Sequence, residues 1–400
     1  MTDCARKPHD DEYADAQGRA VDGADHAAGS SRTATTAAIA GVAEVTPVTS
    51  AQAAAWSPLG PIGLRPEADL DWLPAGAGPG RVVAVHGPSA EVTWSPDGRK
   101  PLRTTLFELR RDLPLRPVTG DWVAVADDAL IDVGPRATTL TRPDPNGRDR
   151  QVLAANVDLV LIVLPIDRGP NLTAVERLSV MAWDSGAAPL IVLTKRDKSA
   201  DPAGAQDEVA TAVPGIEVIA TSAVDGTGIC ELRDRLAPGV TATMLGHSGA
   251  GKTSLLNALE GRTEAVYDVR RDGQGRHTTT TRRLYPLAGG GVLLDLPGLR
   301  RLDLLASAEA VDTTFDDIAA LALNCRFRDC AHAGDAGCAV QSAVDGGRLS
   351  ARRLHTWRRV QRELAHLQRR HDPKALAQER AKWTQISKAQ RAHARLRGRR

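Results

Sequence analysis

The order of four short motifs constrains the fold of this chain more than any other feature of its sequence. A glycine-rich loop of the form G-x-x-x-x-G-K-[ST] runs from Gly246 to Thr253, and Asp295-Leu296-Pro297-Gly298 follows it. Two further motifs, Thr194-Lys195-Arg196-Asp197 and Thr221-Ser222-Ala223, come earlier in the chain. The glycine-rich pattern binds nucleotide phosphates. We therefore expect a nucleotide-binding domain whose phosphate-binding half comes second.

Each motif follows a short apolar run or closes one, and helical patterns separate the runs. Alternating strands and helices are typical of a doubly wound parallel α/β sheet, which gathers ligand loops at the carboxyl ends of its strands. The predicted strands are Val157–Leu164, Pro189–Leu193, Glu217–Ala220, Thr241–Leu245 and Val292–Leu294, and the predicted helices are Leu172–Trp183 and Ser254–Leu259.

The glycine-rich loop predicts how phosphates and a magnesium ion are held. Its glycines let backbone N–H groups converge on the phosphates at the start of the following helix. Lys252 should reach the β- and γ-phosphates, and the Thr253 hydroxyl should bind Mg²⁺. The residues predicted to bind GTP in this loop are Gly246, His247, Ser248, Gly249, Ala250, Gly251, Lys252, Thr253 and Ser254.

The earlier motifs predict a guanine pocket. The Asp197 carboxylate can accept hydrogen bonds from N1–H and the amino group of guanine, whereas adenine presents an acceptor at N1. The Lys195 stem can cover the base, and Arg196, Ser222 and Ala223 belong to the same predicted site. The usual first residue of the motif is Asn, so Thr194 predicts a lower nucleotide affinity. A surface Lys-Arg-Asp turn is the alternative. Ordinary small GTPases carry the base-reading motifs last, so the order here predicts a circular permutation.

The segment after the loop carries the expected moving parts. Asp295 should hold Mg²⁺ through water, and the Gly298 N–H should sense the γ-phosphate. The stretch from Gly275 to Thr281 lies at the position of a mobile switch, where Thr279 and Thr280 are the candidates to complete the Mg²⁺ shell. Many GTPases place Gln directly after Gly298 to orient the attacking water, whereas this chain has Leu299. His277 is the nearest candidate for that catalytic role, and an ordinary exposed histidine is the alternative.

A cysteine and histidine cluster near residue 330 predicts a metal site. Cys325, Cys330, His332 and Cys338 lie within fourteen residues of sequence. Three thiolates and one imidazole form a closed structural Zn²⁺ set, so we expect one ion that supports folding rather than chemistry. Reduced core cysteines are the alternative. Such a cluster favours a reducing cytosol over a disulfide framework.

The regions on either side of the α/β domain differ sharply in composition. Residues 1–75 have few large apolar side chains and are predicted to be a disordered tail. In 76–145, five short β-branched runs predict a small barrel, most simply an OB-fold, for which RNA contact stays open. The runs are Arg81–His86, Ala90–Trp94, Leu102–Leu106, Asp121–Ala126 and Ala129–Val133.

The C-terminal region predicts helices and a polyanionic partner. Ala308–Leu323 reads as one helix, and Leu354, Trp357, Val360, Leu364 and Leu367 mark the apolar face of another. Arginines 352, 353, 358, 359 and 362 are expected on its other faces. Residues 341–400 contain 17 Lys and Arg against 4 Asp and Glu, a net charge of +13, whereas the rest of the chain carries −11. So concentrated a positive charge favours binding to a polyanion, with solubility as the alternative.

No secretory signal and no apolar run of about 18 residues is visible, so we expect a cytoplasmic protein without a membrane partner.

Together these segments resemble the RsgA (YjeQ) family of circularly permuted ribosome-assembly GTPases over about residues 80–390. The most specific elements are Ala155-Asn156-Val157-Asp158, Ala182-Trp183-Asp184-Ser185-Gly186, Gly275–Thr281, Phe327-Arg328-Asp329-Cys330 and Ile386-Ser387-Lys388. The resemblance implies an OB-fold (76–145), a permuted GTPase domain (146–304) and a helical zinc-binding domain with a basic tail (305–400). It also implies a hydrophobic residue at the Leu299 position and a switch histidine at His277.

The resemblance further implies GTP hydrolysis stimulated by the small (30S) ribosomal subunit during late maturation, with 16S rRNA as a partner; we expect a monomer. Two alternatives stay open. One is a nucleotide-gated RNA-binding protein with incidental hydrolysis. The other is a GTPase of a non-ribosomal pathway whose basic tail meets membrane or messenger RNA. Departures from the family pattern are the long N-terminal tail, Thr194, and few aromatic residues in the barrel.

Overall fold

The computed structural model describes residues 59–64, 71–96, 101–143, 150–260, 282–295 and 306–371. Several sequence predictions fall outside these ranges and stay predictions. They concern the switch segment with His277, Thr279 and Thr280, the residues Gly298 and Leu299, the basic stretch beyond 371, and most of the tail predicted to be disordered.

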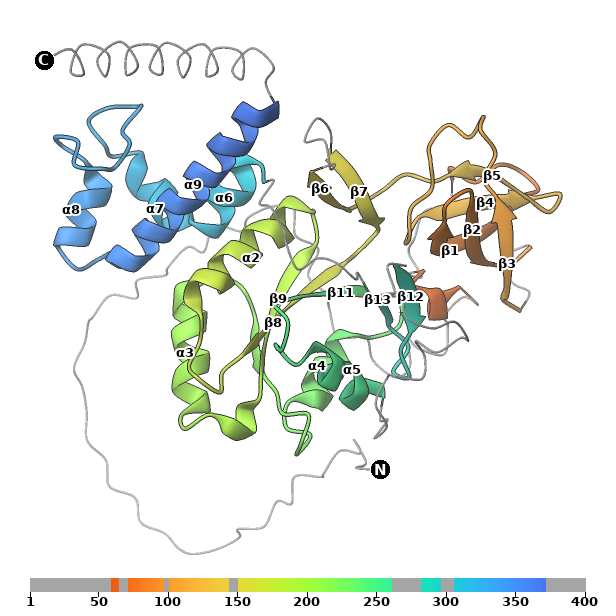
Figure 1. The fold of residues 1–400 in the computed structure, drawn as a ribbon, viewed down its shortest axis with the longest axis horizontal. Helices are drawn as coiled ribbons and strands as arrows, with labels where there is room; N and C mark the ends of the chain where they lie inside the picture. The colour runs from red at the N-terminus through yellow and green to blue at the C-terminus, as the bar shows by residue number, and fades with distance from the viewer. Residues whose placement is uncertain are drawn as a thin grey trace, which may run out of the picture. The chain divides into compact units, whose positions relative to one another are not determined.

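A parallel sheet forms the centre of the described structure (Figure 1). Its strands follow the spatial order β10-β9-β8-β11-β13, and β12 pairs antiparallel with β13 at the end of this order. Near-continuous apolar runs build these strands because a parallel sheet is buried on both faces. Their bounds are β8 (Leu159–Pro165), β9 (Ala188–Thr194), β10 (Val218–Ala220), β11 (Thr241–Leu245), β12 (Arg283–Pro286) and β13 (Val292–Asp295).

The chain order through this sheet is that of a permuted domain. β8, β9 and β10 are laid down first and form one half, and β11 then enters beside β8 rather than at the far edge. The glycine-rich loop follows β11, and Asp295 ends the neighbouring parallel strand β13. The predicted α/β architecture and the exchanged order of its halves are therefore confirmed.

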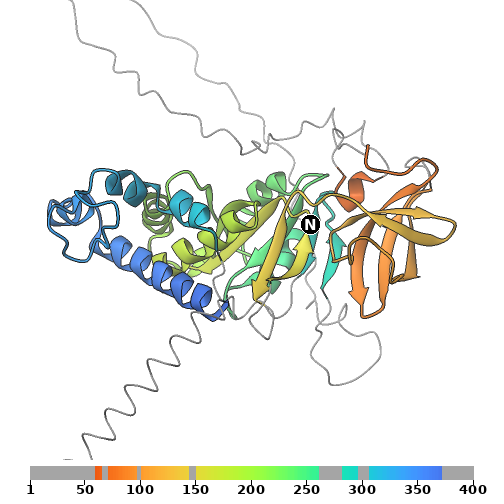
Figure 2. The same ribbon diagram turned by 90° about the horizontal axis from the view of Figure 1, so that it is seen from above.

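Four helices accompany these strands: α2 (Leu172–Asp184), α3 (Pro202–Ala212), α4 (Ile229–Arg235) and α5 (Lys252–Glu260). The side chains of Asn171 and Asp201 cap the starts of α2 and α3 by accepting hydrogen bonds from Ala174 N and Gly204 N. α2 packs against β8 and β9, so it lies directly over the base-reading half of the sheet. Figure 2 shows these layers from a second side.

Five antiparallel strands precede this sheet in the chain. They pair in the order β3-β2-β1-β4-β5 around Val82, Val92, Trp94, Phe107 and Val125. One bridge, Ala84 to Arg283, joins β1 to β12, so a single sheet runs through both regions. The strands are β1 (Gly78–His86), β2 (Ser89–Trp94), β3 (Arg103–Glu108), β4 (Trp122–Ala126) and β5 (Ala129–Val133), each close to its predicted run.

Two segments differ from the sequence predictions in this half of the chain. β6 (Thr139–Pro143) and β7 (Arg150–Ala155) form a hairpin that was not predicted, and the proposed domain boundary at 145 and 146 falls in its connection. Part of the segment predicted to be disordered is folded, since a short helix, η1 (Gly60–Ile62), buries Leu59, Ile62 and Leu64.

The buried Arg81 explains why that segment folds. Its guanidinium donates hydrogen bonds to the carbonyls of Ile62 (2.9 Å), Gly120 (3.2 Å) and Asn156 (2.8 Å) and lies over the Trp122 ring. Burial lowers the pKa of Arg81 to about 10, which still leaves it charged at neutral pH. A buried cation needs such partners, and Ile62 supplies one of them.

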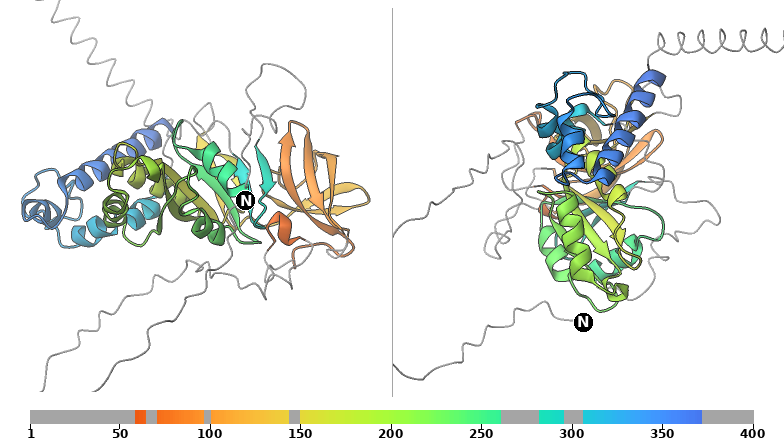
Figure 3. Two further views of the ribbon diagram at one scale, coloured as in Figure 1. Left: turned by 90° about the horizontal axis from the view of Figure 1, so that it is seen from below. Right: turned by 90° about the vertical axis from the view of Figure 1, so that its left-hand side faces the viewer.

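The C-terminal part consists of α6 (Ala308–Thr314), α7 (Asp316–Ala322), α8 (Ala339–Asp345) and α9 (Ala351–His371), which Figure 3 shows from two further sides. The prediction of one helix over Ala308–Leu323 was wrong, because the backbone leaves the helical region at Phe315 (φ −116°, ψ 44°). Phe315 is fully buried there, and the new helix begins with Asp316 and Asp317, which favour a helix N-terminus.

The arginines of α9 also depart from the prediction. Leu354, Val360 and Leu364 are buried as expected. Arg353, however, is only 5% exposed, and Arg352 and Arg358 are half-buried in contacts with other helices. Between residues 351 and 365 of α9, only Arg359 and Arg362 are exposed arginines. Much of the predicted basic surface of this helix is therefore internal structure.

Candidate nucleotide site and metal centre

The strand order brings the predicted guanine and phosphate motifs to the same end of the sheet. Thr194 ends β9 and lies opposite Pro165 of β8, while Leu245 at the end of β11 lies opposite Ile162 of β8. The Thr194 hydroxyl donates a hydrogen bond of 2.5 Å to the carbonyl of Ala250 in the glycine-rich loop. Motifs separated by about fifty residues of sequence are thus in direct contact.

This contact shows what Thr194 does in place of Asn. Its side chain is 5% exposed and is held between the carbonyls of Ala250 and Leu164. A bulkier neighbour would disturb it, since a Cβ on Gly251, at φ +92°, would lie 3.2 Å from the Thr194 oxygen. The hydroxyl therefore links the two halves of the site, although it cannot supply the amide N–H of an Asn.

The two base-reading segments also contact each other. The Ser222 hydroxyl donates to the Asp197 carboxylate (2.9 Å), and Arg196 N donates to the Thr221 carbonyl (3.1 Å). These bonds fix the Asp197 carboxylate at the end of the sheet. The second carboxylate oxygen accepts no hydrogen bond from the described residues, which suits an acceptor that must meet a ligand.

Lys195 has a conformation that needs support. Its backbone is left-handed at φ 58°, ψ 37°, which is unfavourable for a residue with a Cβ and is typical of functional sites. Its ammonium group donates to Asp167 (3.0 Å), a residue that follows β8. The hydrogen bond from Lys195 lowers the pKa of Asp167 and keeps that carboxylate ionised. Asp167 was not predicted from the sequence, where only its place after a strand marks it.

The glycine-rich loop is held close to the sheet. A Cβ on Gly246 would lie 2.4 Å from the carbonyl of Val163, so only glycine lets the loop approach β8 this closely. Lys252 donates to the carbonyls of Gly246 (2.6 Å) and His247 (2.9 Å). Both carbonyls belong to the glycine-rich loop, which is predicted to bind phosphate together with Lys252. Thr253 and Ser254 lie in the first turn of α5, and both residues are exposed.

Two of the predicted magnesium ligands are described: Asp295 ends β13, and Thr253 lies in α5. Thr243 of β11 pairs with Leu294 of β13, so Asp295 stands one residue beyond this pair, beside the end of β11. Asp295 is half-buried, and Thr253 lies in the first turn of α5, which follows β11 through the glycine-rich loop. A carboxylate and a hydroxyl are the oxygen ligands that Mg²⁺ prefers.

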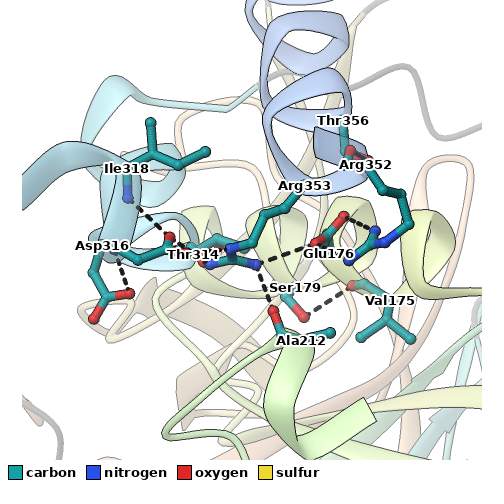
Figure 4. Close-up of polar contacts among 11 residues, drawn as sticks. Val175, Glu176, Ser179, Ala212, Thr314, Asp316, Ile318, Arg352, Arg353 and Thr356 are labelled. Carbon is teal, nitrogen blue, oxygen red and sulfur yellow. Dashed lines mark hydrogen bonds and ion pairs between the residues drawn. The ribbon is translucent and has the colours of Figure 1, made fainter. Parts of the chain in front are cut away.

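A buried ion-pair cluster joins α9 to the helix that covers the base-reading strands (Figure 4). Glu176 of α2 is fully buried and accepts hydrogen bonds from Arg352 (2.9 and 3.0 Å) and Arg353 (3.1 Å). Arg353 also pairs with Asp317 of α7 and donates to the carbonyls of Thr314 and Ala212. The C-terminal helices therefore contact α2 and the end of α3 through one cluster.

The four predicted metal ligands come together. The ligand atoms of Cys325, Cys330, His332 and Cys338 all lie within 4.8 Å of one another, and the three cysteines are free. With Zn–S near 2.3 Å and Zn–N near 2.0 Å, the ligand atoms of a tetrahedral site stand roughly 3.5–3.8 Å apart. The observed separations are 3.4 Å from Cys338 Sγ to His332 Nδ1, 3.6 Å from Cys325 Sγ to the same nitrogen, and 4.0 Å between these two sulfurs.

The surroundings of the cluster suit a metal centre. Burial lowers the pKa of His332, which favours the neutral imidazole that a metal needs, and the His332 ring packs against Trp357 of α9 at 5.3 Å. Arg358 of α9 donates to the His332 carbonyl. Cys338 caps α8 by accepting from Gln341 N (3.3 Å). The donor set can hold a zinc ion, and its position is fixed by α8 and α9.

These features define a circularly permuted P-loop GTPase. The RsgA GTPase family model matches residues 133–305. The small ribosomal subunit biogenesis GTPase RsgA of Streptomyces coelicolor is 44% identical over 314 residues, which cover 75% of this chain and 84% of that protein. The RsgA of Opitutus terrae is 42% identical over 301 residues, covering 71% and 82%. The chain belongs to the RsgA GTPase family and is a GTP hydrolase.

Solved structures agree with this fold. YjeQ from Thermotoga maritima is 27% identical and matches with a TM-score of 0.57, covering 72% of this chain and 99% of that one. YloQ, a circularly permuted GTPase, is 22% identical with a TM-score of 0.54 over 73% of this chain and 96% of its own, and shows the fold alone. Among the described residues, no helix is long and apolar enough to cross a membrane.

Proposed function

We propose that this chain hydrolyses GTP as a late maturation checkpoint on the small ribosomal subunit, and that the subunit stimulates hydrolysis. The names of its relatives assign them to small ribosomal subunit biogenesis. The observation that carries the proposal is the hydrogen bond from Thr194 to Ala250, which joins guanine and phosphate motifs in the permuted order. Family membership and this geometry support one GTP site.

In this site we assign recognition of guanine to Asp197, oriented by Ser222, and cover of the base to the stem of Lys195. Arg196 and Ala223 belong to the same base-reading loops. Residues 246–254 surround the phosphates, and Lys252 contacts the β- and γ-phosphates. The Gly298 N–H senses the γ-phosphate. Thr253 and Asp295, with Thr279 and Thr280, hold Mg²⁺, which neutralises phosphate charge when bound. Leu299 cannot hydrogen-bond, so another group must position the attacking water, and we assign this role to His277.

Two flanking domains would contact the particle. We assign an OB-fold to the five strands around Trp94 and Phe107, because β1 pairs with both β2 and β4, as a small Greek-key barrel requires. Cys325, Cys330, His332 and Cys338 would hold one structural Zn²⁺ that orders the loop before α8. The barrel and the basic residues beyond 371 would bind 16S rRNA in the cytoplasm, with the protein acting as a monomer.

The permutation supplies a route for coupling. α6 begins at Ala308, ten residues after Gly298, and Ser307 N donates to Asp184 at the end of α2 (2.6 Å). Movement at Gly298 on loss of the γ-phosphate would therefore reach the C-terminal helices through a short connection. α2 and the Glu176 cluster set the position from which they move.

Turnover measurements test this function. GTP hydrolysis by the full chain is measured alone, with purified 30S subunits, and with anionic lipid vesicles. We expect slow hydrolysis alone and strong acceleration by 30S subunits only. No acceleration by 30S subunits would remove the checkpoint role and leave a nucleotide-gated RNA-binding protein. Acceleration by vesicles alone would point to a non-ribosomal pathway.

The base-reading assignment has a separate test. Asp197→Asn should move the preference from GTP toward XTP, because an amide N–H can meet the additional carbonyl of xanthine. Competition binding of GTP and XTP measures this exchange, and Asp207→Asn on the exposed side of α3 is the matched control. An unchanged preference for GTP in Asp197→Asn would show that Asp197 does not read the base.

A further inference from the structure

A second positively charged cavity lies away from the glycine-rich loop, between the barrel, the β6–β7 hairpin and the start of β12. It has a volume of about 530 Å³. Its polar lining consists of His86, Arg116, Thr119, Arg136, Gln151 and Arg282, with no Asp or Glu among the described residues that line it. A cavity of this size can hold a small ligand, and its lining selects an anion.

The three arginines are not equivalent. Arg136 is neutralised, because both oxygens of the fully buried Asp121 accept from it at 2.7 Å. Arg116 is exposed and uses one nitrogen to donate to the Gly87 carbonyl (2.8 Å). The guanidinium of Arg282 has no hydrogen-bond or ion-pair partner within the described part of the chain, and only its carbonyl is engaged, by Thr119.

Arg282 is therefore a cation for which no described residue supplies an anion. It is half-buried, and the charge of Arg142 adds to its own. Burial and, to a smaller degree, the nearby Arg142 lower the pKa of Arg282. Charge-assisted bonds from several guanidinium groups favour a phosphate, whose oxygens can accept from donors on different sides.

We propose that this cavity is a second phosphate-binding site, in which Arg282 and Arg116 bind one phosphate group. The group could belong to an RNA backbone or to a free nucleotide, and the chemistry of recognition is the same. Arg282 directly follows the predicted switch segment that ends at Thr281. A phosphate bound here would thus be held by the residue next to that segment.

Binding measurements on the full chain, saturated with GDP and Mg²⁺ to fill the loop at 246–254, test the proposal without ribosomal subunits. A single-stranded RNA oligonucleotide and pyrophosphate are the two probes, followed by fluorescence anisotropy and calorimetry. Arg282→Gln and the double variant Arg282→Gln/Arg116→Gln are compared with Arg235→Gln, which removes one charge from α4. GDP affinity in every variant checks that the GTPase domain is folded.

We expect about a tenfold loss of affinity in Arg282→Gln, since one charge-assisted contact is removed. A loss of affinity for RNA assigns the site to a nucleic acid backbone. In that case the slope of log K against log salt concentration should become shallower by about 0.7 for each lost phosphate contact. Loss for pyrophosphate alone assigns it to a free nucleotide. If both probes bind both variants as tightly as they bind Arg235→Gln, the site does not exist. None of these outcomes depends on stimulation by 30S subunits.

Discussion

At the scale of single residues, the Thr194 hydroxyl is the contact on which the site most depends. It donates a hydrogen bond from the end of β9 into the glycine-rich loop, and this bond satisfies the carbonyl of Ala250. A threonine at this position keeps β9 connected to the glycine-rich loop. Compared with the usual Asn, it lacks the amide N–H that could donate to the base. The expected cost in nucleotide affinity is therefore partly offset by the connection that remains.

Replacing this hydroxyl tests the connection. Thr194→Val keeps the shape but leaves the Ala250 carbonyl unpaired, so we expect GDP affinity to fall about tenfold, equivalent to roughly 1.4 kcal/mol. Thr194→Ser, the matched control, keeps the hydroxyl and should bind within about twofold of the original chain. Titration with a fluorescent GDP analogue gives both values. Equal affinities for the Val and Ser variants would contradict the role assigned to the hydroxyl.

The sequence predicted which residues meet in the site but not how they meet. The motif pattern identified Asp197, Ser222 and Lys252, because each motif carries a fixed chemistry. The contacts of Thr194 with Ala250 and of Lys195 with Asp167 could not be predicted, since they depend on which strands become neighbours. His277 and Gly298 lie outside the described residues, so their roles rest on the sequence motifs and, for His277, also on the resemblance.

At the scale of elements, the cluster around Glu176 joins α9 to α2. Five hydrogen bonds join four side chains there, of which Glu176 and Arg353 are buried, and removing one partner leaves the others without compensation. Arg352 and Arg353 look like part of a basic surface in the sequence. Periodicity could not separate them from Arg359, because the acidic partner lies about 176 residues away.

Truncating the acid should loosen the C-terminal helices. We expect Glu176→Ala to lower the free energy of unfolding by about 3 kcal/mol, because the buried Arg353 and the half-buried Arg352 lose a carboxylate. The control Arg359→Ala breaks an exposed pair with Glu363 and should cost no more than about 0.5 kcal/mol. Urea unfolding and hydrogen exchange along α9 measure the effect. Unchanged protection of α9 in Glu176→Ala would show that the cluster does not hold this helix.

The loop before α8 should depend on its metal in the same way. Residues 325–338 contain little regular structure, and α8 and α9 hold them through Cys338, His332 and Arg358. A strong chelator should therefore remove hydrogen-exchange protection from 325–338 while the central sheet keeps its own. Adding zinc back should restore protection, and magnesium should not. Full protection after chelation and metal analysis would argue against structural zinc.

Local rules explain which elements were predicted. Long apolar runs such as β8 and the face of α9 were correct because burial dictates them. The break at Phe315 was missed, because the segment has helical spacing and the reason for the break is tertiary. Leaving the helix buries Phe315 beneath Arg353 and places Asp317 against the same guanidinium. The β6–β7 hairpin, with its mixed polar sequence, gave no comparable signal.

At the scale of the whole molecule, charge is separated along the chain. Residues 372–400 carry nine Lys and Arg against two acidic residues, whereas α9 uses several of its arginines internally. The interaction with a polyanion should therefore depend mainly on the terminal segment and the barrel. This division differs from the uniform basic tail that composition suggests.

Truncation tests the division of charge. If the full chain neutralises roughly 6–10 phosphates, its RNA affinity should fall about 10³–10⁵-fold between 50 and 200 mM salt. A chain ending at residue 371 should show a distinctly shallower dependence, while its GDP affinity stays the same. Arg359→Ala in the full chain is the control for a single exposed charge. An identical salt dependence for the two lengths would show that residues 372–400 do not bind RNA.

The setting of Arg81 limits how this protein can be recombined. The arginine belongs to β1, yet two of its three acceptors, Ile62 and Asn156, belong to the segments that precede and follow the five strands β1–β5. A chimera that takes only residues 78–133 from a distant relative would contain an arginine from the relative. Its guanidinium would have to hydrogen-bond carbonyls of this protein for which its position was not selected. Chimeras that fold should therefore exchange residues 59 to 156 together, so that Arg81 keeps its own hydrogen-bond acceptors.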